Sequence, residues 1–203
     1  IAMPNKDYVP GIVHDESLRN LKYPLDWDAL LDYIGLPCVL KDAHGGGWKG
    51  VFICHTKEDL WHAYNQSGLY TMVLQEYIHW DHYVRCMCLG QEEVLPMKYD
   101  PHARRYIVDH AHLSPELGER IVGDALKLVR ALGYDMNTAE FAIRDGVPYA
   151  IDFMNPAPDM DINSLTPAYF EWCVRHMADM VIDLAKNPRP QLTELKWSAL
   201  FNK

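Results

Sequence analysis

The sequence of 203 residues has no apolar run that approaches the 18 or more residues of a membrane-spanning helix. Its first residues also lack the pattern of a secretory signal peptide. We therefore expect a cytoplasmic protein without a membrane partner. Repeats and low-complexity segments are absent too, and hydrophobic residues make up 49% of the chain and charged residues 23%, which is typical of a globular protein.

Positive charge is scarce. The chain has 19 lysines and arginines against 28 aspartates and glutamates, and its formal net charge is −9. A protein that binds nucleic acid presents a basic face to the phosphate backbone, so we expect no nucleic-acid partner. A small phosphate-bearing ligand is compatible with this charge, because one phosphate cluster needs only a few local cations.

The cysteines have neither the CxxC spacing nor the spacing of a zinc ribbon. They are five, an odd number, and most lie in apolar runs: Cys38, Cys54, Cys86, Cys88 and Cys173. We interpret them as buried free thiols in a reducing compartment rather than as disulfides.

The order of patterns along the chain predicts an α+β fold of helices packed on mostly antiparallel sheets. Residues 1–24 form an arm or linker, 25–80 a smaller lobe, 81–190 a larger lobe and 191–203 a tail. Helices are predicted over 26–35, 56–68, 114–133 and 166–186. Strands are predicted over 37–41, 51–54, 72–78, 83–89, 92–97, 105–109, 138–143 and 149–153.

Two of these predictions are specific. The strands between Met72 and Asp109 are expected to form one antiparallel meander. The last helix is expected to bury an apolar stripe that consists of Phe170, Val174, Met177, Val181 and Leu184.

A lysine and a glycine run lie between the first two strands, in the segment KDAHGGGWKG that begins at Lys41. Glycines let backbone N–H groups approach phosphate oxygens closely, and lysines neutralise the charge. The spacing is not that of a Walker A loop, and a strand rather than a helix follows. A glycine-rich loop between antiparallel strands is instead the solution that protein kinases use for nucleotide phosphates. A plain hairpin turn is the alternative.

Two further segments carry candidate ligands. Glu76 ends an apolar strand, as in adenine sites where the backbone binds the base edge, although a solvated glutamate explains it equally well. Glu140 and Asp152 lie on two strands joined by a turn at Asp145, and Asn155 follows. Two carboxylates and an amide oxygen suit magnesium. The apolar neighbours of Asp152 predict a buried carboxylate that needs a partner; acids on a solvent-facing hairpin are the alternative.

Together these segments resemble the ATP-grasp superfamily, most closely its glutathione-synthetase-like and glutamate-ligase-like carboxylate–amine ligases. The resemblance covers 21–186. It rests, in order, on LPCVLK at 36–41, GGGWKG at 45–50, LQEYI at 74–78, VRCMCLG at 84–90, and Glu140 with DFMNP at 152–156.

The resemblance implies two α+β lobes that hold the nucleotide between them, and a Mg-ATP-dependent ligase that activates a carboxylate as an acyl-phosphate for attack by an amine or thiol. ATP would be held by Lys41, Gly45, Gly46, Gly47, Lys49, Glu76, Tyr77, Ile78 and, at the ribose position, His82. Mg²⁺ (or Mn²⁺) would be held by Glu140, Asp152 and Asn155. Arg85 would stabilise the acyl-phosphate as the catalytic residue.

The chain departs from the family pattern at three places. Asp152 and Asn155 are one residue further apart than the usual Glu-x-Asn ligands, so they need a bulge or a shifted ligand. The ribose acid is replaced at His82 and Tyr83. The α/β domain that normally precedes these lobes is expected to be missing. A nucleotide-binding module without turnover, acting as a sensor or scaffold, is therefore the alternative function, and an unrelated α+β ligand-binding domain is a third. Whether the chain forms a homo-oligomer stays open.

Overall fold

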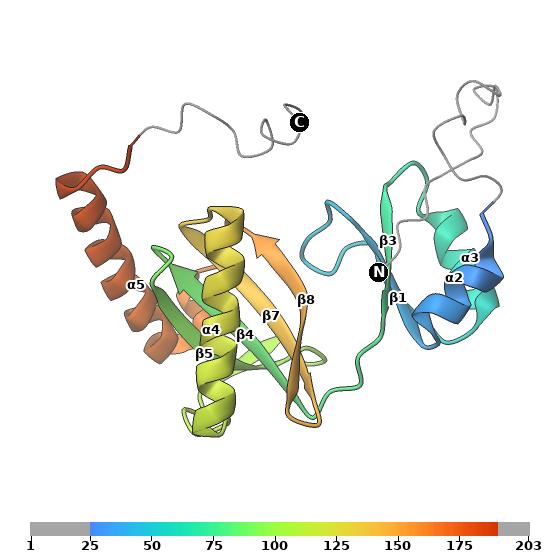
Figure 1. Ribbon diagram of the computed structural model, residues 1–203, viewed down its shortest axis with the longest axis horizontal. Helices are drawn as coiled ribbons and strands as arrows, with labels where there is room; N and C mark the ends of the chain where they lie inside the picture. The colour runs from blue at the N-terminus through green and yellow to red at the C-terminus, as the bar shows by residue number, and fades with distance from the viewer. Residues whose placement is uncertain (1–24, 191–203) are drawn as a thin grey trace, which may run out of the picture. The chain divides into compact units, whose positions relative to one another are not determined.

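The structure, a computed structural model, describes residues 25–190 (Figure 1). The chain divides into two units between Ile78 and His79. None of the helices within 25–190 combines the length and the apolar character that crossing a bilayer demands.

Over residues 25–78, the first unit consists of a three-stranded antiparallel sheet and two helices. Its strands are ordered β2-β1-β3, so β1 is central. Lys41 on β1 lies opposite Val51 on β2 and Val73 on β3, which confirms the predicted hairpin between the first two strands. The elements are α2 (Trp27–Ile34), β1 (Cys38–Asp42), β2 (Val51–Cys54), α3 (Lys57–Gln66) and β3 (Met72–Glu76).

Both helices cover the same face of this sheet (Figure 1). The covered face carries Cys38 and Leu40 of β1 and Leu74 of β3, which pack with Leu60 and Tyr64 of α3. Successive side chains of a strand point to opposite faces. Val39, Lys41 and Gln75 therefore share the other face.

The second unit is a five-stranded antiparallel sheet in the order β6-β5-β4-β7-β8. Helix α4 covers one face (Figure 1), where its residues Ile121, Ala125 and Val129 pack with Val84 of β4 and Phe141 of β7. The elements are β4 (His82–Leu89), β5 (Glu93–Asp100), β6 (Arg105–Ile107), α4 (Pro115–Leu132), β7 (Met136–Arg144), β8 (Val147–Asn155) and α5 (Ile162–Lys186). The α+β class is confirmed.

The second core gives a direct test of the packing. Ile121 is 0% exposed under the sheet, so Ile121→Val should lower the free energy of unfolding by about 0.5 to 1.5 kcal/mol. Ile182, which is 50% exposed on α5, provides the matched control, because Ile182→Val removes the same methylene without leaving a cavity. Chemical denaturation of both variants checks the prediction, and equal losses would contradict the placement of Ile121.

The predicted meander is correct only in part. Strands β4, β5 and β6 are neighbours in one sheet, whereas β3 pairs with β1 in the other. Alternating apolar residues mark a strand but do not identify its partner. The connection between β3 and β4 is therefore a passage from one unit to the next rather than a turn of the meander.

The predicted inward face of the last helix is correct only in part, because Phe170, Met177 and Leu184 are partly buried. Val174 and Val181 are 52% and 54% exposed, and the buried residues are Leu165, Tyr169 and Cys173. The helix also begins earlier, at Ile162, and Thr166 interrupts it with a φ of 71° before Pro167. Helix α5 has apolar residues on more than one side, and their spacing alone does not predict which side is buried against the protein. The cysteines, by contrast, are all buried free thiols as predicted.

Candidate functional site

The candidate phosphate loop leaves β1 directly after Lys41. The backbone N–H of Asp42 donates to the carbonyl of Gly50 (3.2 Å), so the two ends of the loop stay paired. Within it, Gly47 and Gly50 adopt φ values of 62° and 68°. These conformations are easy for glycine and strained for other residues. The loop is exposed from residue 44 to residue 50, although the N–H groups of His44, Gly45 and Lys49 already donate hydrogen bonds within it.

The two lysines of this segment do not share a face. Gly45, Gly46 and Lys49 line a pocket of about 300 Å³ together with Phe52, Ser67 and Met72. Phe52 and Met72 belong to the face of the sheet that the helices cover. Lys41 lies on the opposite face, because it follows Leu40 by one residue along β1.

The predicted adenine segment follows the same rule of alternation. Glu76 is exposed, and it lies opposite Cys38 of β1. Cys38 precedes Lys41 by three residues, so Glu76 and Lys41 lie on opposite faces of the sheet. The N–H of Tyr77 donates to the carbonyl of Pro37 (3.4 Å), and Ile78 is buried. Partial burial also raises the pKa of the Tyr77 phenol.

Gln75 is a candidate nucleotide-binding residue that the sequence did not indicate. It is buried, and it shares the face of Lys41. The sequence alone could not indicate Gln75, because its place on the face of Lys41 follows only from the pairing of β3 with β1.

His82, the residue predicted at the ribose position, begins β4 in the second unit and is exposed. It lines a pocket of about 180 Å³ whose other members include Trp80, Tyr83, Lys98 and His102. The rings of Trp80 and His102 stack at 5.5 Å, and Lys98 Nζ forms an ion pair with Asp109 (2.9 Å).

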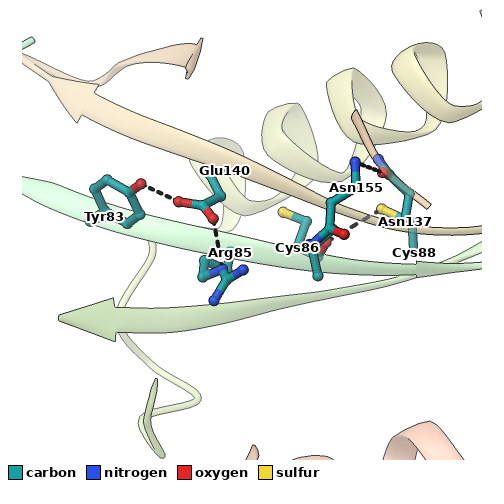
Figure 2. A network of polar contacts seen from close by, with 8 residues as sticks. Tyr83, Arg85, Cys86, Cys88, Asn137, Glu140 and Asn155 are labelled. Atoms are coloured by element: carbon teal, nitrogen blue, oxygen red, sulfur yellow. Dashed lines mark hydrogen bonds and ion pairs between the residues drawn. The ribbon is translucent and has the colours of Figure 1, made fainter. Parts of the chain in front are cut away.

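The polar centre of the second unit is the carboxylate of Glu140 (Figure 2). Glu140 lies opposite Arg85 across β7 and β4. Arg85 Nε is 3.0 Å from Glu140 Oε1, and the Tyr83 hydroxyl donates to Oε2. The side chains of Arg85 and Glu140 are only 18% and 17% exposed, so this charge pair is largely removed from water.

Two tyrosine rings, from strands β5 and β6, pack against the guanidinium of Arg85. Its central carbon lies 4.8 Å from the ring centre of Tyr99 and 5.5 Å from that of Tyr106. Burial by itself would lower the pKa of Arg85, but Glu140 and these tyrosines raise it above its usual value. Burial raises the pKa of Tyr106 to about 12. Burial, followed by the Glu140 charge, raises the pKa of Tyr83, so this phenol remains a donor at neutral pH.

Strand β8 brings the other two predicted metal ligands to the face of Glu140. Asp152 lies opposite Glu140, and Asn155 lies opposite Thr138. Two residues of β7 thus face three residues of β8, which is a β-bulge. Thr138 and Glu140 share a face, so the bulge puts Asp152 and Asn155 on that face as well. Of the two alternatives that the spacing allowed, a bulge or a shifted ligand, the structure has the bulge.

Hydrogen bonds hold Asn155 in this place. Its side-chain Nδ2 donates to Thr138 Oγ1 (2.8 Å), and its backbone N–H donates to Asn137 Oδ1 (2.9 Å). The buried Asn137 in turn donates from Nδ2 to the carbonyl of Phe153 (3.0 Å). Figure 2 shows the two asparagines side by side at this end of the strand pair.

The sequence argument for Asp152 was wrong in one respect. Asp152 is exposed, not buried, although Ile151 and Phe153 beside it are partly covered. It belongs to β8, an edge strand, where apolar neighbours do not enclose a side chain. Its role as a ligand therefore cannot rest on a need for a buried partner.

The donor set fits magnesium in its chemistry. Within 25–190, no three His, Cys, Asp or Glu side chains come together as a metal cluster, and the set here is two carboxylates with one amide. An ionised carboxylate offers about four lone-pair sites. Arg85 and Tyr83 occupy some of these lone-pair sites on Glu140. Mg²⁺ binds through one or two carboxylates together with the phosphates of its substrate.

Several known proteins are similar to this chain, although no family model matches it. The D-alanine–D-alanine ligase of Polynucleobacter asymbioticus is 28% identical over 177 residues, 77% of this chain and 52% of the ligase. The D-alanine–D-alanine ligase of Bacillus anthracis complexed with ATP has a TM-score of 0.64 at 23% identity, over 82% of this chain and 56% of that one.

A third similar structure is the biotin carboxylase domain of the Hydrogenobacter thermophilus 2-oxoglutarate carboxylase, which is a dimer in complex with MgADP, ADP and bicarbonate. Its TM-score is 0.55 at 24% identity, and the match covers 74% of this chain and 38% of that one. The matches thus span about half the length of the two ligases and 38% of the carboxylase chain. The chain therefore shares its fold with ATP-grasp enzymes and is similar to them in sequence.

Proposed function

We propose that the protein belongs to a Mg-ATP-dependent ligase that joins a small carboxylic acid to an amine or a thiol. One observation carries the proposal. Glu140 and Asp152 face each other across β7 and β8, a bulge adds Asn155 to the same face, and Arg85 lies beside Glu140. The similar proteins that carry ATP or MgADP support a nucleotide as the ligand.

In this proposal the first unit binds the nucleotide. Lys41 and the loop residues Gly45, Gly46, Gly47 and Lys49 bind the phosphates. The side chain of Glu76 and the backbone of Tyr77 and Ile78 bind adenine.

The second unit supplies the remaining groups. His82 contacts the ribose, and Glu140, Asp152 and Asn155 hold the ion, for which Mn²⁺ is a suitable replacement because it accepts the same oxygen ligands. Bound Mg²⁺ neutralises charge on the phosphate oxygens. Arg85 stabilises the negative charge of the acyl-phosphate from its place between Tyr99 and Tyr106.

The chemistry of such a ligase has two displacements. A carboxylate oxygen of the acid attacks the γ-phosphorus, and the bond to the β-phosphate oxygen breaks to release ADP. The amine nitrogen or thiol sulfur then attacks the acyl carbon, loses a proton and expels inorganic phosphate. The side chains act mainly by positioning the reactants and by neutralising charge.

A nucleotide-binding module without turnover is the second candidate. The observation that favours it is the engagement of both Glu140 oxygens by Arg85 and Tyr83. The two candidates differ in one result. A ligase releases phosphate from ATP in the presence of an acid and a nucleophile, and a binding module does not.

The phosphate role of Lys41 is tested by calorimetry with ATP and Mg²⁺. Lys41→Ala should weaken binding by about 10- to 100-fold, because it removes a charged hydrogen-bond donor from the phosphates. Lys57→Ala is the control: Lys57 belongs to the same unit but pairs with Asp28. Equal affinities for wild type and Lys41→Ala would remove Lys41 from the site.

A further inference from the structure

Arg85 and Tyr83 contact the carboxylate of Glu140 in different ways. Arg85 lies 3.0 Å from Oε1 as an ion pair, yet its Nε has no hydrogen bond of acceptable geometry within the described residues. The Tyr83 hydroxyl, by contrast, makes a hydrogen bond to Oε2. An ion pair constrains the distance between two charges, whereas a hydrogen bond also constrains direction. The hydrogen bond from Tyr83 therefore constrains how the carboxylate is turned.

Tyr83 can do this because it is itself immobile. Its side chain is 6% exposed in the middle of the sheet, and Trp80 packs edge-on against its ring with a centroid distance of 5.5 Å. Tyr99 packs against it at 6.0 Å. Its backbone lies on β4 opposite Ala142 of β7. Glutamate, with three rotatable side-chain bonds, has far more freedom to lose.

The Glu140 orientation matters because Asp152 is the facing residue on β8. Asp152 is exposed, so its side chain is not fixed by packing. An ion shared by both carboxylates needs at least one of them in a defined place, and partners that fix a ligating side chain strongly affect metal affinity. We propose that Tyr83 is a positioning residue for the metal site: its hydroxyl fixes the Glu140 carboxylate in an orientation that can share a divalent ion with Asp152. This role rests on the proposed function.

The test is Tyr83→Phe, which removes only the hydroxyl. Manganese titrated into the full chain with ADP, followed by electron paramagnetic resonance of free Mn²⁺, should give an affinity about 10- to 100-fold weaker than wild type. ADP binding without metal should stay unchanged. Tyr169→Phe is the matched control. Tyr169 is equally buried in the second unit and also donates a hydroxyl hydrogen bond, but to the carbonyl of Ile107 (2.9 Å).

A double-mutant cycle separates positioning from a general loss of stability. If Tyr83 acts through Glu140, Tyr83→Phe should have no further effect on Mn²⁺ affinity in a Glu140→Gln background. An additive effect would overturn the inference. Thermal melting checks that each variant is folded; should Tyr83→Phe unfold, Tyr83→His, which retains a ring donor, takes its place and should bind Mn²⁺ more tightly than Tyr83→Leu.

The outcomes for the two proposals are distinct. If wild type and Tyr83→Phe bind Mn²⁺–ADP equally well, the role of Tyr83 is overturned and the proposed function stands. Wild type that shows no metal-dependent binding of ADP would overturn the proposed function and this role with it.

Discussion

Replacing Asp152 with asparagine should weaken Mg²⁺-dependent binding of ADP by at least about 100-fold. The substitution keeps the shape of the side chain but removes one of the two charges that face each other across β7 and β8. Loss of a residue that merely orients a metal ligand already costs about 10- to 100-fold in affinity, so loss of a charged ligand is expected to exceed that range. Calorimetry with ADP at several Mg²⁺ concentrations measures the effect. The weak binding of ADP without metal should be spared.

Asp145→Asn is the control for this prediction. Asp145 lies at the turn of the same hairpin with a φ of 53°, a conformation that asparagine also tolerates. It removes the same charge at the far end of the two strands and should leave metal-dependent binding unchanged. Crystals soaked with Mn²⁺ and ADP provide a second check, because anomalous density away from Glu140, Asp152 and Asn155 would refute the assignment.

The parts of the fold that could be predicted are those fixed by local signals. Ser114 accepts a hydrogen bond from the N–H of Leu117, and Gly133 ends the same helix in a left-handed conformation, as the cap residues indicate. The hairpin of β7 and β8 likewise follows from the turn at Asp145 and Gly146. Such signals lie within a few residues of one another, so the sequence displays them directly.

The parts that could not be predicted depend on partners far along the chain. The pairing of β3 with β1 and the covered face of α5 are decided by which surfaces meet, and apolar spacing is the same for either choice. The exposure of Asp152 has the same cause, since it follows from the edge position of β8.

The candidate site divides in the same way. Glu140 and Asp152 were predictable as a pair because a single tight turn separates their strands. The contacts of Glu140 with Arg85 and Tyr83 were not, because Tyr83 lies 57 residues before Glu140 and the register of β4 on β7 decides which side chains meet. The spacing before Asn155 allowed either a bulge or a shifted ligand, and only the register shows that the strand has a bulge.

Replacing Arg85 with methionine should lower the rate of phosphate release by about 100- to 1,000-fold, the usual effect of removing one group that stabilises charge in the transition state. The affinity for ATP should change little, because the contact with the acyl-phosphate is made chiefly in the transition state. Methionine retains much of the packing against Tyr99 and Tyr106. Pairs of amino acids and small dicarboxylates are screened for phosphate release from ATP, and kcat and KM are then compared for an active pair.

The direction in which Mn²⁺ affinity changes distinguishes this catalytic role of Arg85 from a merely structural one. Arg85 occupies one oxygen of Glu140 and neutralises its charge, so its removal should leave Mn²⁺ affinity equal to wild type or tighter while turnover falls. A structural defect would weaken both. Arg105→Met, at an exposed position on the outermost strand β6, is the control and should affect neither. Phosphate release that is unchanged in Arg85→Met would remove Arg85 from the reaction, and ATP binding without turnover for any acid–nucleophile pair would favour the binding module instead.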